Sequence, residues 1–264
     1  METKQPRNKT GPLRKCFREE EEAESEENKI EIGVDEAGRG PLFGRLYVAG
    51  VVLPKDCKHD LMKDSKRFSS EKKIREVAEY IKQHAVAWTV QYAESDVIDE
   101  INIRQAVLRT MRECCRDIID KTNRSPASYR LLIDGNDFPP YTMFDPTTET
   151  LVGVESHTVE GGDNQYTCIA AASILAKVAR DDWIGELCLK HPVLKEWYGI
   201  DKNKGYGTAE HMRGIKERGI TCWHRRSYGP CKTATLVDAT CGKTSTLVDV
   251  ALGKTATLVD ATCG

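Results

Sequence analysis

The chain has 264 residues, ten cysteines and a formal net charge of −2. This length allows one domain of ordinary size with additional tails, and the near-neutral charge does not by itself indicate a nucleic-acid-binding protein. The sequence shows no Cys-x-x-Cys pair, no secretory signal and no apolar run near membrane-spanning length, so we expect a cytoplasmic protein with free thiols.

The charge is unevenly distributed along the chain. Residues 1–28 are polar, and residues 19–27 contain seven Glu and no basic residue, which predicts a disordered acidic tail. Residues 177–232 instead contain 12 Lys and Arg against 7 Asp and Glu, a local charge of +5. This basic segment is compatible with a polyanionic partner, although ordinary surface variation would explain it equally well.

The first regular element is a strand that leads into two adjacent carboxylates. Apolar and polar residues alternate from Ile30 to Asp35, which is typical of a strand with one buried face. Asp35 and Glu36 then precede the loop Gly38–Pro41, and a second apolar strand follows over 46–53. Such an acidic pair beside a loop that exposes its backbone can hold a hard cation against a phosphate. A hairpin with a solvated acidic turn is the alternative.

Strands and helices alternate through the rest of the domain. Ser70 caps a predicted helix over 71–84, a strand covers 85–92, and Asn102 caps a helix that runs to about 119. A short apolar strand over 129–133 ends at Asp134, a further strand is expected near 151–159, and helices are expected near 166–181, 183–198 and 208–218. This order predicts an α/β fold over 29–231, with a mixed five-stranded sheet flanked by helices and a helical C-terminal part. Residues 232–264 are three tandem 11-residue repeats, which we predict to be disordered.

Carboxylates follow two of the predicted strands. If these strands are parallel neighbours, Asp35 and Asp134 lie about 5 Å apart, which is the spacing between strands. Glu36 can join them only if the backbone turns after Asp35, and Asp163 could approach from the start of the helix near 166. Four such carboxylates repel one another unless cations neutralise them, and two divalent ions would do so. Spacing alone does not select these four from the 41 acidic residues.

Several motifs occur in a fixed order and strongly resemble the ribonuclease HII family. They are DEAGRGP after the first strand, DSK at 64–66, IDEINIRQA at 98–106, AAASILAKVARD at 170–181, KGYGT at 204–208 and HRRSYGP at 224–230. The resemblance spans residues 30–228 and implies a ribonuclease H-like fold. It also implies that Asp35, Glu36, Asp134 and Asp163 bind Mg²⁺ or Mn²⁺, two ions per active site, and carry the catalysis.

The same resemblance implies a substrate. Members of the family cleave the RNA strand of RNA–DNA hybrids and cut duplex DNA at embedded ribonucleotides, leaving 5′-phosphomonoesters, so we expect a monomeric enzyme that removes RNA primers and misincorporated ribonucleotides. Gly38, Arg39 and Gly40 would read the ribose 2′-hydroxyl, which distinguishes RNA from DNA. Tyr206 would pack on the neighbouring sugar, and the remaining substrate contacts, to phosphates, would come from Ser65 and Lys66. The chain departs from the family at Gly161, where Lys usually precedes the Gly-Asp pair.

Two alternatives remain at this point. One is a ribonuclease HIII-like enzyme, a family that has a substrate-binding domain before the core and usually Lys in the loop, where this chain has a short tail and Arg39. The other is a protein that binds RNA–DNA hybrids without cleaving them. The retention of all four carboxylates argues against this alternative. We expect packing or surface roles for His157 and His224, and a solvated face for Arg225 and Arg226, with phosphate contact as the alternative.

Overall fold

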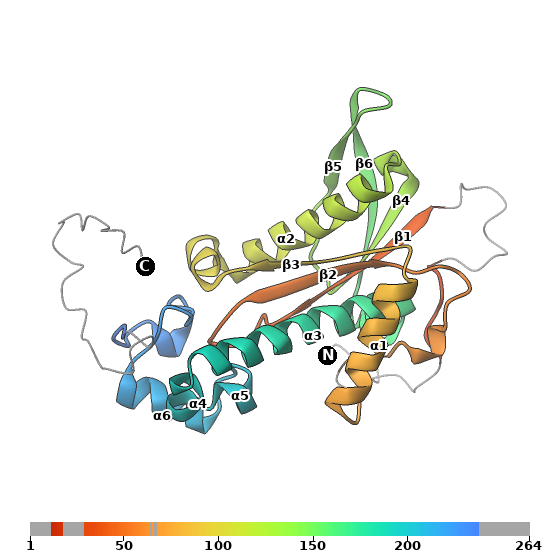
Figure 1. Cartoon of the computed structure of the whole chain (residues 1–264). Coiled ribbons are helices and arrows are strands. Elements are labelled where there is room, and N and C mark those ends of the chain that lie inside the picture. Colours follow the sequence, from red (N-terminus) through yellow and green to blue (C-terminus); the bar gives the residue numbers. More distant parts are fainter. Residues whose placement is uncertain (1–11, 18–28, 64, 66–67, 238–264) are drawn as a thin grey trace, which may run out of the picture.

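The computed structural model describes residues 12–17, 29–63, 65 and 68–237 (Figure 1). Its centre is a six-stranded mixed sheet of order β3-β2-β1-β4-β6-β5. The central pairs β1–β4 and β4–β6 are parallel, whereas the outer pairs β1–β2, β2–β3 and β5–β6 are antiparallel. The strands are β1 (Ile30–Ala37), β2 (Leu46–Val52), β3 (Ala87–Ala93), β4 (Tyr129–Asp134), β5 (Tyr141–Asp145) and β6 (Thr150–Val159).

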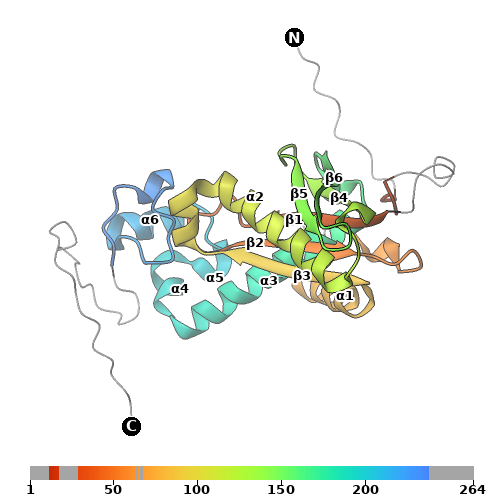
Figure 2. The ribbon, with the colours of Figure 1, turned by 90° about the horizontal axis from the view of Figure 1, so that it is seen from above.

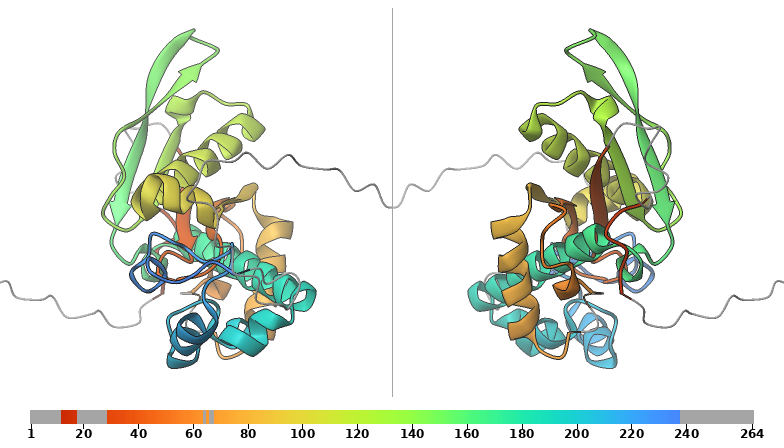
Figure 3. Two further views of the ribbon diagram at one scale, coloured as in Figure 1. Left: turned by 90° about the vertical axis from the view of Figure 1, so that its left-hand side faces the viewer. Right: turned by 90° about the vertical axis from the view of Figure 1, so that its right-hand side faces the viewer.

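Helices cover both faces of this sheet (Figures 1 and 3). The long helix α2 (Ser95–Thr122) packs on one face, over a core that includes Ile32, Val34 and Met111. Helices α1 (Glu71–His84) and α3 (Thr167–Lys190) pack on the other face, where the small side chains 170–172 let α3 approach the sheet closely. Apolar burial on both faces accounts for the nearly continuous apolar sequence of β4.

The C-terminal part is a small helical cluster at one end of the sheet (Figure 2). It contains α4 (Val193–Tyr198), α5 (Ile200–Asn203) and α6 (Ala209–Arg218), and its own apolar core includes Phe43 from the loop after β1. The amide of Leu42 donates to the carbonyl of Gly205 over 2.9 Å. The cluster is therefore joined to the segment that carries the Gly-Arg-Gly sequence.

The α/β class is confirmed, but the predicted number of five strands is wrong. The sixth strand, β5, is a short edge strand that follows Pro139 and Pro140 and pairs only with β6. Its side chains alternate weakly and leave Phe144 59% exposed, so the residue pattern gave little indication of a strand. A strand at the edge of a sheet needs only one partner strand, so it tolerates a sequence with weak alternation of apolar and polar residues.

The predicted caps are confirmed, and two helices are longer than expected. Ser70 accepts the Lys73 amide at the start of α1, and the Asn102 side chain accepts the Gln105 amide over 3.1 Å. Helical turns also precede Asn102, which interrupts α2 with a φ of 64°. Helix α3 continues to Lys190 rather than ending near residue 181.

Short described pieces of both tails lie against the domain. The backbone of Arg14 bonds to Gln165 and Thr167, and Val237 donates to the carbonyl of Ile220 over 2.7 Å. The remaining parts of the predicted disordered tails, 1–11, 18–28 and 238–264, lie outside the described residues. In the described part of the chain, no helix has both the length and the apolar character needed to cross a membrane.

Candidate active site

The two carboxylates expected on neighbouring strands do lie side by side. Strand β1 pairs in parallel with β4, and Val34 is in register with Ile133, so Asp35 and Asp134 follow at the same edge of the sheet. Asp35 is 4% exposed. Burial, together with the negative charges of Asp134 and Glu36, raises the pKa of Asp35 well above its usual range. This edge of the sheet therefore brings several carboxylates close together, where burial and mutual repulsion both disfavour their ionised forms.

Glu36 joins this group and is tied to the following loop. Burial raises the pKa of Glu36; the nearby charge of Arg39 opposes this shift, and that of Asp134 adds to it. A guanidinium nitrogen of Arg39 lies 3.6 Å from a carboxylate oxygen of Glu36. The expected turn after Asp35 is absent, because β1 continues through Ala37 with Glu36 paired to Val48, and Glu36 joins the group from within the strand.

Asp163 lies in a single 3-10 turn, Gly162–Asn164, just before α3. This turn contacts the strand carboxylates directly, since the amide of Gly162 donates to Oδ1 of Asp134 over 2.6 Å. Asp163 is 6% exposed, and its Oδ1 accepts the side-chain amide of Asn164. Gly161 precedes the turn with a left-handed φ of 64°, and a side chain added there would meet open space.

Close contact between α3 and β1 brings a serine to Asp35. A Cβ on Gly33 would lie 2.3 Å from the backbone of Cys168, so only glycine permits this approach. Further along α3, Ser173 lies beside Asp35 and opposes part of the rise in the pKa of that carboxyl, and its oxygen is 3.1 Å from the hydroxyl of Ser65. The sequence analysis missed Ser173, whose only signal was a lone polar residue on a face of alanines.

The loop after β1 brings two of the expected substrate-binding elements together. Gly38 is buried with a left-handed φ of 92°, whereas Arg39 and Gly40 are exposed. A Cβ on Gly40 would lie 3.6 Å from Cε1 of Tyr206, which is 52% exposed. Tyr206 therefore presents its ring beside the loop. Lys66 lies outside the described residues, and of the DSK motif only Ser65 is placed, at a buried position.

The solvated position predicted for Arg225 and Arg226 is wrong for Arg225. Arg225 is fully buried, and its guanidinium donates to carbonyls of the loop after β1. Arg226 is exposed, as expected. His224 has the expected packing role, because its ring lies between those of Phe43 and Tyr198.

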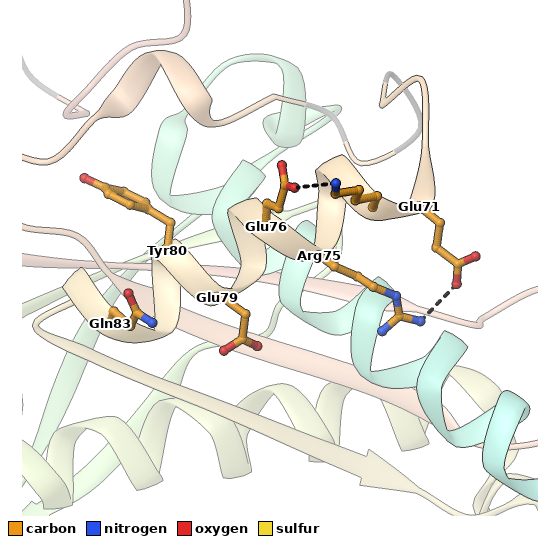
Figure 4. A pocket seen from close by; sticks show the side chains of 7 residues that line it. Glu71, Arg75, Glu76, Glu79, Tyr80 and Gln83 are labelled. Carbon is orange, nitrogen blue, oxygen red and sulfur yellow. Dashed lines mark hydrogen bonds and ion pairs between the residues drawn. The ribbon is translucent and has the colours of Figure 1, made fainter.

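One hollow of the described surface lies near the carboxylates, and another lies away from them. The nearer hollow is narrow and is lined by residues that include Glu36, Arg39, Asp134 and Asp137. A wider hollow, of about 700 Å³, lies along α1. Figure 4 shows that its lining comes from that one helix, with Arg75 and Glu71 paired to each other at the surface. The wider hollow is thus a solvated helix face and has no group poised for chemistry.

The carboxylates are suited to hard divalent cations. Among the residues that the structure describes, no group of three His, Cys, Asp or Glu side chains is arranged closely enough to hold a metal ion. The donor set nevertheless consists of carboxylate oxygens, which Mg²⁺ and Mn²⁺ prefer. The raised pKa of Asp35 also reflects repulsion that a bound cation would relieve.

Comparison with solved structures identifies the class of fold. The ribonuclease HII of Archaeoglobus fulgidus, solved in complex with PCNA, has a TM-score of 0.54 at 24% identity over 76% of this chain and 95% of that chain. The ribonuclease H2 of Pyrococcus horikoshii has a TM-score of 0.53 at 21% identity with the same coverage. A ribonuclease HIII, Bst-RNase HIII in complex with Mn²⁺, has a TM-score of 0.53 at 16% identity, over 78% of this chain and 68% of that chain. The protein therefore has the fold of the type 2 ribonucleases H.

Comparison of sequences identifies the family. The Ribonuclease HII family profile matches residues 32–231. A ribonuclease HII of Parabacteroides distasonis is 41% identical over 77% of this chain and 92% of its own length, and one of Bacteroides thetaiotaomicron is 42% identical over 75% and 89%. The chain belongs to the ribonuclease HII family and is a ribonuclease H-type endoribonuclease.

Proposed function

We propose that this enzyme cleaves the RNA strand of RNA–DNA hybrids and cuts duplex DNA at embedded ribonucleotides, acting as a monomer in the removal of primers and misincorporated ribonucleotides. The observation that carries this proposal is the group of carboxylates at the ends of β1 and β4, of which Asp35 is buried, beside a loop with exposed backbone. The carboxylates suit metal-dependent phosphodiester hydrolysis, and the loop suits recognition of a small polar group such as the 2′-hydroxyl.

The proposed ligands of two Mg²⁺ or Mn²⁺ ions are Asp35, Glu36, Asp134 and Asp163. Such ions, when bound, supply an activated water and stabilise the leaving oxygen. Hydrolysis forms a bond from the water oxygen to phosphorus and breaks the bond to the 3′ oxygen, which takes up a proton, so a 5′-phosphomonoester remains. The chain contributes by orienting these carboxylates: the Gly162 amide donates to Asp134, and Ser173 beside Asp35 opposes part of the rise in the pKa of that carboxyl.

The proposed substrate contacts surround this centre. Gly38, Arg39 and Gly40 read the 2′-hydroxyl, and the Tyr206 ring packs on the next sugar from its position beside Gly40. Lys66 contacts a phosphate. Ser65 is buried and its hydroxyl is hydrogen-bonded to that of Ser173, so any phosphate contact from Ser65 comes from its backbone.

Cleavage of a DNA duplex that contains one ribonucleotide tests the proposal. We expect a single cut at the ribonucleotide with Mg²⁺ or Mn²⁺, no cut with a chelator, and no cut of the same duplex made only of DNA. A 5′-phosphate on the downstream product would match the proposed hydrolysis. Tight binding without cleavage under either metal would instead favour a hybrid-binding protein.

A further inference from the structure

Arg225 is an unusual residue for the interior of a protein. It is the largest of the fully buried side chains, and within the described residues it forms no ion pair. Burial lowers the pKa of its guanidinium. A buried charge without an opposite charge is costly unless its donors are fully used, so its hydrogen bonds need an explanation.

These hydrogen bonds all go to the neighbourhood of one loop. The guanidinium donates to the carbonyls of Gly38 over 2.6 Å, Arg39 over 3.0 Å, Pro41 over 2.9 Å and Gly44 over 3.0 Å. One side chain thus binds four carbonyls within a stretch of seven residues. Replacing it by an apolar residue would leave the carbonyls of the buried residues Gly38, Pro41 and Gly44 without this donor.

Tyr228 binds the same loop together with Arg225, and we call these two residues the clamp. Its hydroxyl donates to the carbonyl of Arg39 over 2.7 Å and accepts a hydrogen bond from Arg225 over 3.1 Å. The turn that carries both residues is fixed from α2, because Asp99 accepts the amides of Arg226 and Ser227 over 2.8 Å each. The clamp is therefore anchored to a helix on the sheet.

Fixing these carbonyls also fixes the amides of the loop. In a trans peptide the C=O of one residue and the N–H of the next point in opposite directions. The carbonyls of Gly38 and Arg39 face Arg225, so the amides of Arg39 and Gly40 face away from it. Both residues are exposed, and among the described residues neither amide donates to another group of the chain. The loop therefore presents two oriented donors on the side away from Arg225, and the Tyr206 ring lies beside Gly40.

We propose that Arg225 and Tyr228 are positioning residues that set the specificity for the ribose 2′-hydroxyl by holding the amides of Arg39 and Gly40 toward it. This inference rests on the proposed function of the loop. Neither residue needs to touch the substrate; both act through the carbonyls that they bind. The direct consequence is that the preference for ribonucleotide over deoxyribonucleotide depends on the hydroxyl of Tyr228, which lies outside the Gly-Arg-Gly sequence.

Binding of two matched duplexes tests the proposal without relying on turnover. One duplex carries a single ribonucleotide and the other is the same sequence in DNA, and affinities are measured with Ca²⁺ under conditions where no product forms. We expect Tyr228→Phe to weaken binding of the ribonucleotide duplex about three- to tenfold, the size of one lost hydrogen bond, and to leave binding of the DNA duplex unchanged. Arg225→Lys, which cannot reach four carbonyls, should remove most of the preference.

Tyr198→Phe is the matched control. Its hydroxyl also donates to a buried carbonyl, that of Gly219 over 3.0 Å, but has no contact with the loop. It should lower the melting temperature and leave the ratio of the two affinities as in the wild type. If Tyr228→Phe folds and keeps the wild-type ratio, the clamp has no role in specificity and the inference is overturned. If the wild type itself binds both duplexes equally, the proposed reading of the 2′-hydroxyl fails, and the inference fails with it.

Discussion

Asp134 is the site carboxylate whose charge can be removed with least disturbance. Its Oδ1 accepts the Gly162 amide, and an Asn at this position keeps that acceptor. We expect Asp134→Asn to lower cleavage by at least about a hundredfold, because part of the proposed ion site is lost. Without metal the variant should melt at a higher temperature than the wild type, because Asp35 is relieved of a neighbouring charge.

Asp117→Asn is a suitable control for this experiment. Asp117 pairs with Lys121 on the surface of α2, so its loss should leave activity unchanged. Near-wild-type cleavage by Asp134→Asn at saturating Mg²⁺ would contradict the assignment of Asp134 as an ion ligand.

Tyr206 separates two kinds of substrate. Its ring is exposed beside Gly40, and in the proposed function it packs on a sugar next to the ribonucleotide, a contact that would contribute about 1–3 kcal/mol. A deoxyribose without a 2′-hydroxyl should fit best against the ring. Tyr206→Ala should therefore reduce kcat/KM for a single embedded ribonucleotide far more than for a long RNA–DNA hybrid, measured at one salt concentration. Equal losses would make Tyr206 a general positioning residue.

At the scale of elements, the described N-terminal segment, residues 12–17, packs against the central strands, and we call it the strap. The Phe17 ring stacks on His157 at 4.3 Å, and its amide donates to Glu31 over 2.9 Å. Glu31 is in register with Arg130, which bonds to Glu155 on β6. This contact lies at the start of β1, at the opposite end of the strand from Asp35.

We expect Phe17→Ala to lower the free energy of unfolding by about 1–2 kcal/mol, from the lost ring contacts, with unchanged cleavage at 25 °C. Urea unfolding measures this, and Phe144→Ala, at an exposed position on β5, should have almost no effect. A chain that begins at residue 29 should accordingly be active but less stable than one that begins at residue 12. Loss of cleavage in a folded Phe17→Ala protein would show that the strap also acts on the active site.

The histidines of the C-terminal part form a chain of hydrogen bonds with a fixed direction. The Thr221 amide donates to Nδ1 of His224, so the other ring nitrogen of His224 carries a proton and donates to Nε2 of His211 over 3.1 Å. His211 in turn donates from Nδ1 to the carbonyl of Tyr206. Both rings are neutral in this arrangement, and a further proton would place two donors face to face.

Stability should therefore fall at acid pH. Burial lowers the pKa of both histidines, and for His224 the neighbouring His211 adds to this effect. The unfolded chain then binds protons more readily, so the stabilisation is fully present above about pH 6.5 and is lost as the pH falls below it, by at most about 1.4 kcal/mol per pH unit for each histidine. Urea unfolding at pH 7.5 and 5.5 should show a larger difference for the wild type than for His224→Gln. The same difference in both proteins would contradict this account.

At the scale of the whole molecule, the charge of the tail opposes that of the C-terminal part. Residues 19–27 carry seven Glu, whereas residues 177–232 have a local charge of +5. Replacing the seven Glu by Gln should tighten binding of an RNA–DNA hybrid at low salt, because repulsion of the phosphates is removed, and the gain should shrink as salt rises. Fluorescence anisotropy at 50 and 300 mM salt measures both effects. An equal gain at the two concentrations would show that the effect is not electrostatic.

The sequence by itself determined most of the elements, though not the edge strand β5, and most members of the candidate site. Alternation around Asp35, the cap at Ser70 and the apolar strand before Asp134 are local signals, and each corresponds to an observed element because periodicity and capping depend on neighbouring residues. The ordered motifs then selected the four carboxylates, and the parallel pairing of β1 with β4 places two of them at one edge.

Only the tertiary structure decided which distant residues support this site. Ser173 reaches Asp35 because Gly33 lets α3 touch β1, and Arg225 enters the interior because four carbonyls of a loop more than 180 residues away accept its donors. A sequence pattern describes a charged pair such as Arg225–Arg226 by its hydrophilicity and so predicts a solvated face. Whether such a charge is buried depends on hydrogen-bond partners that only folding brings together.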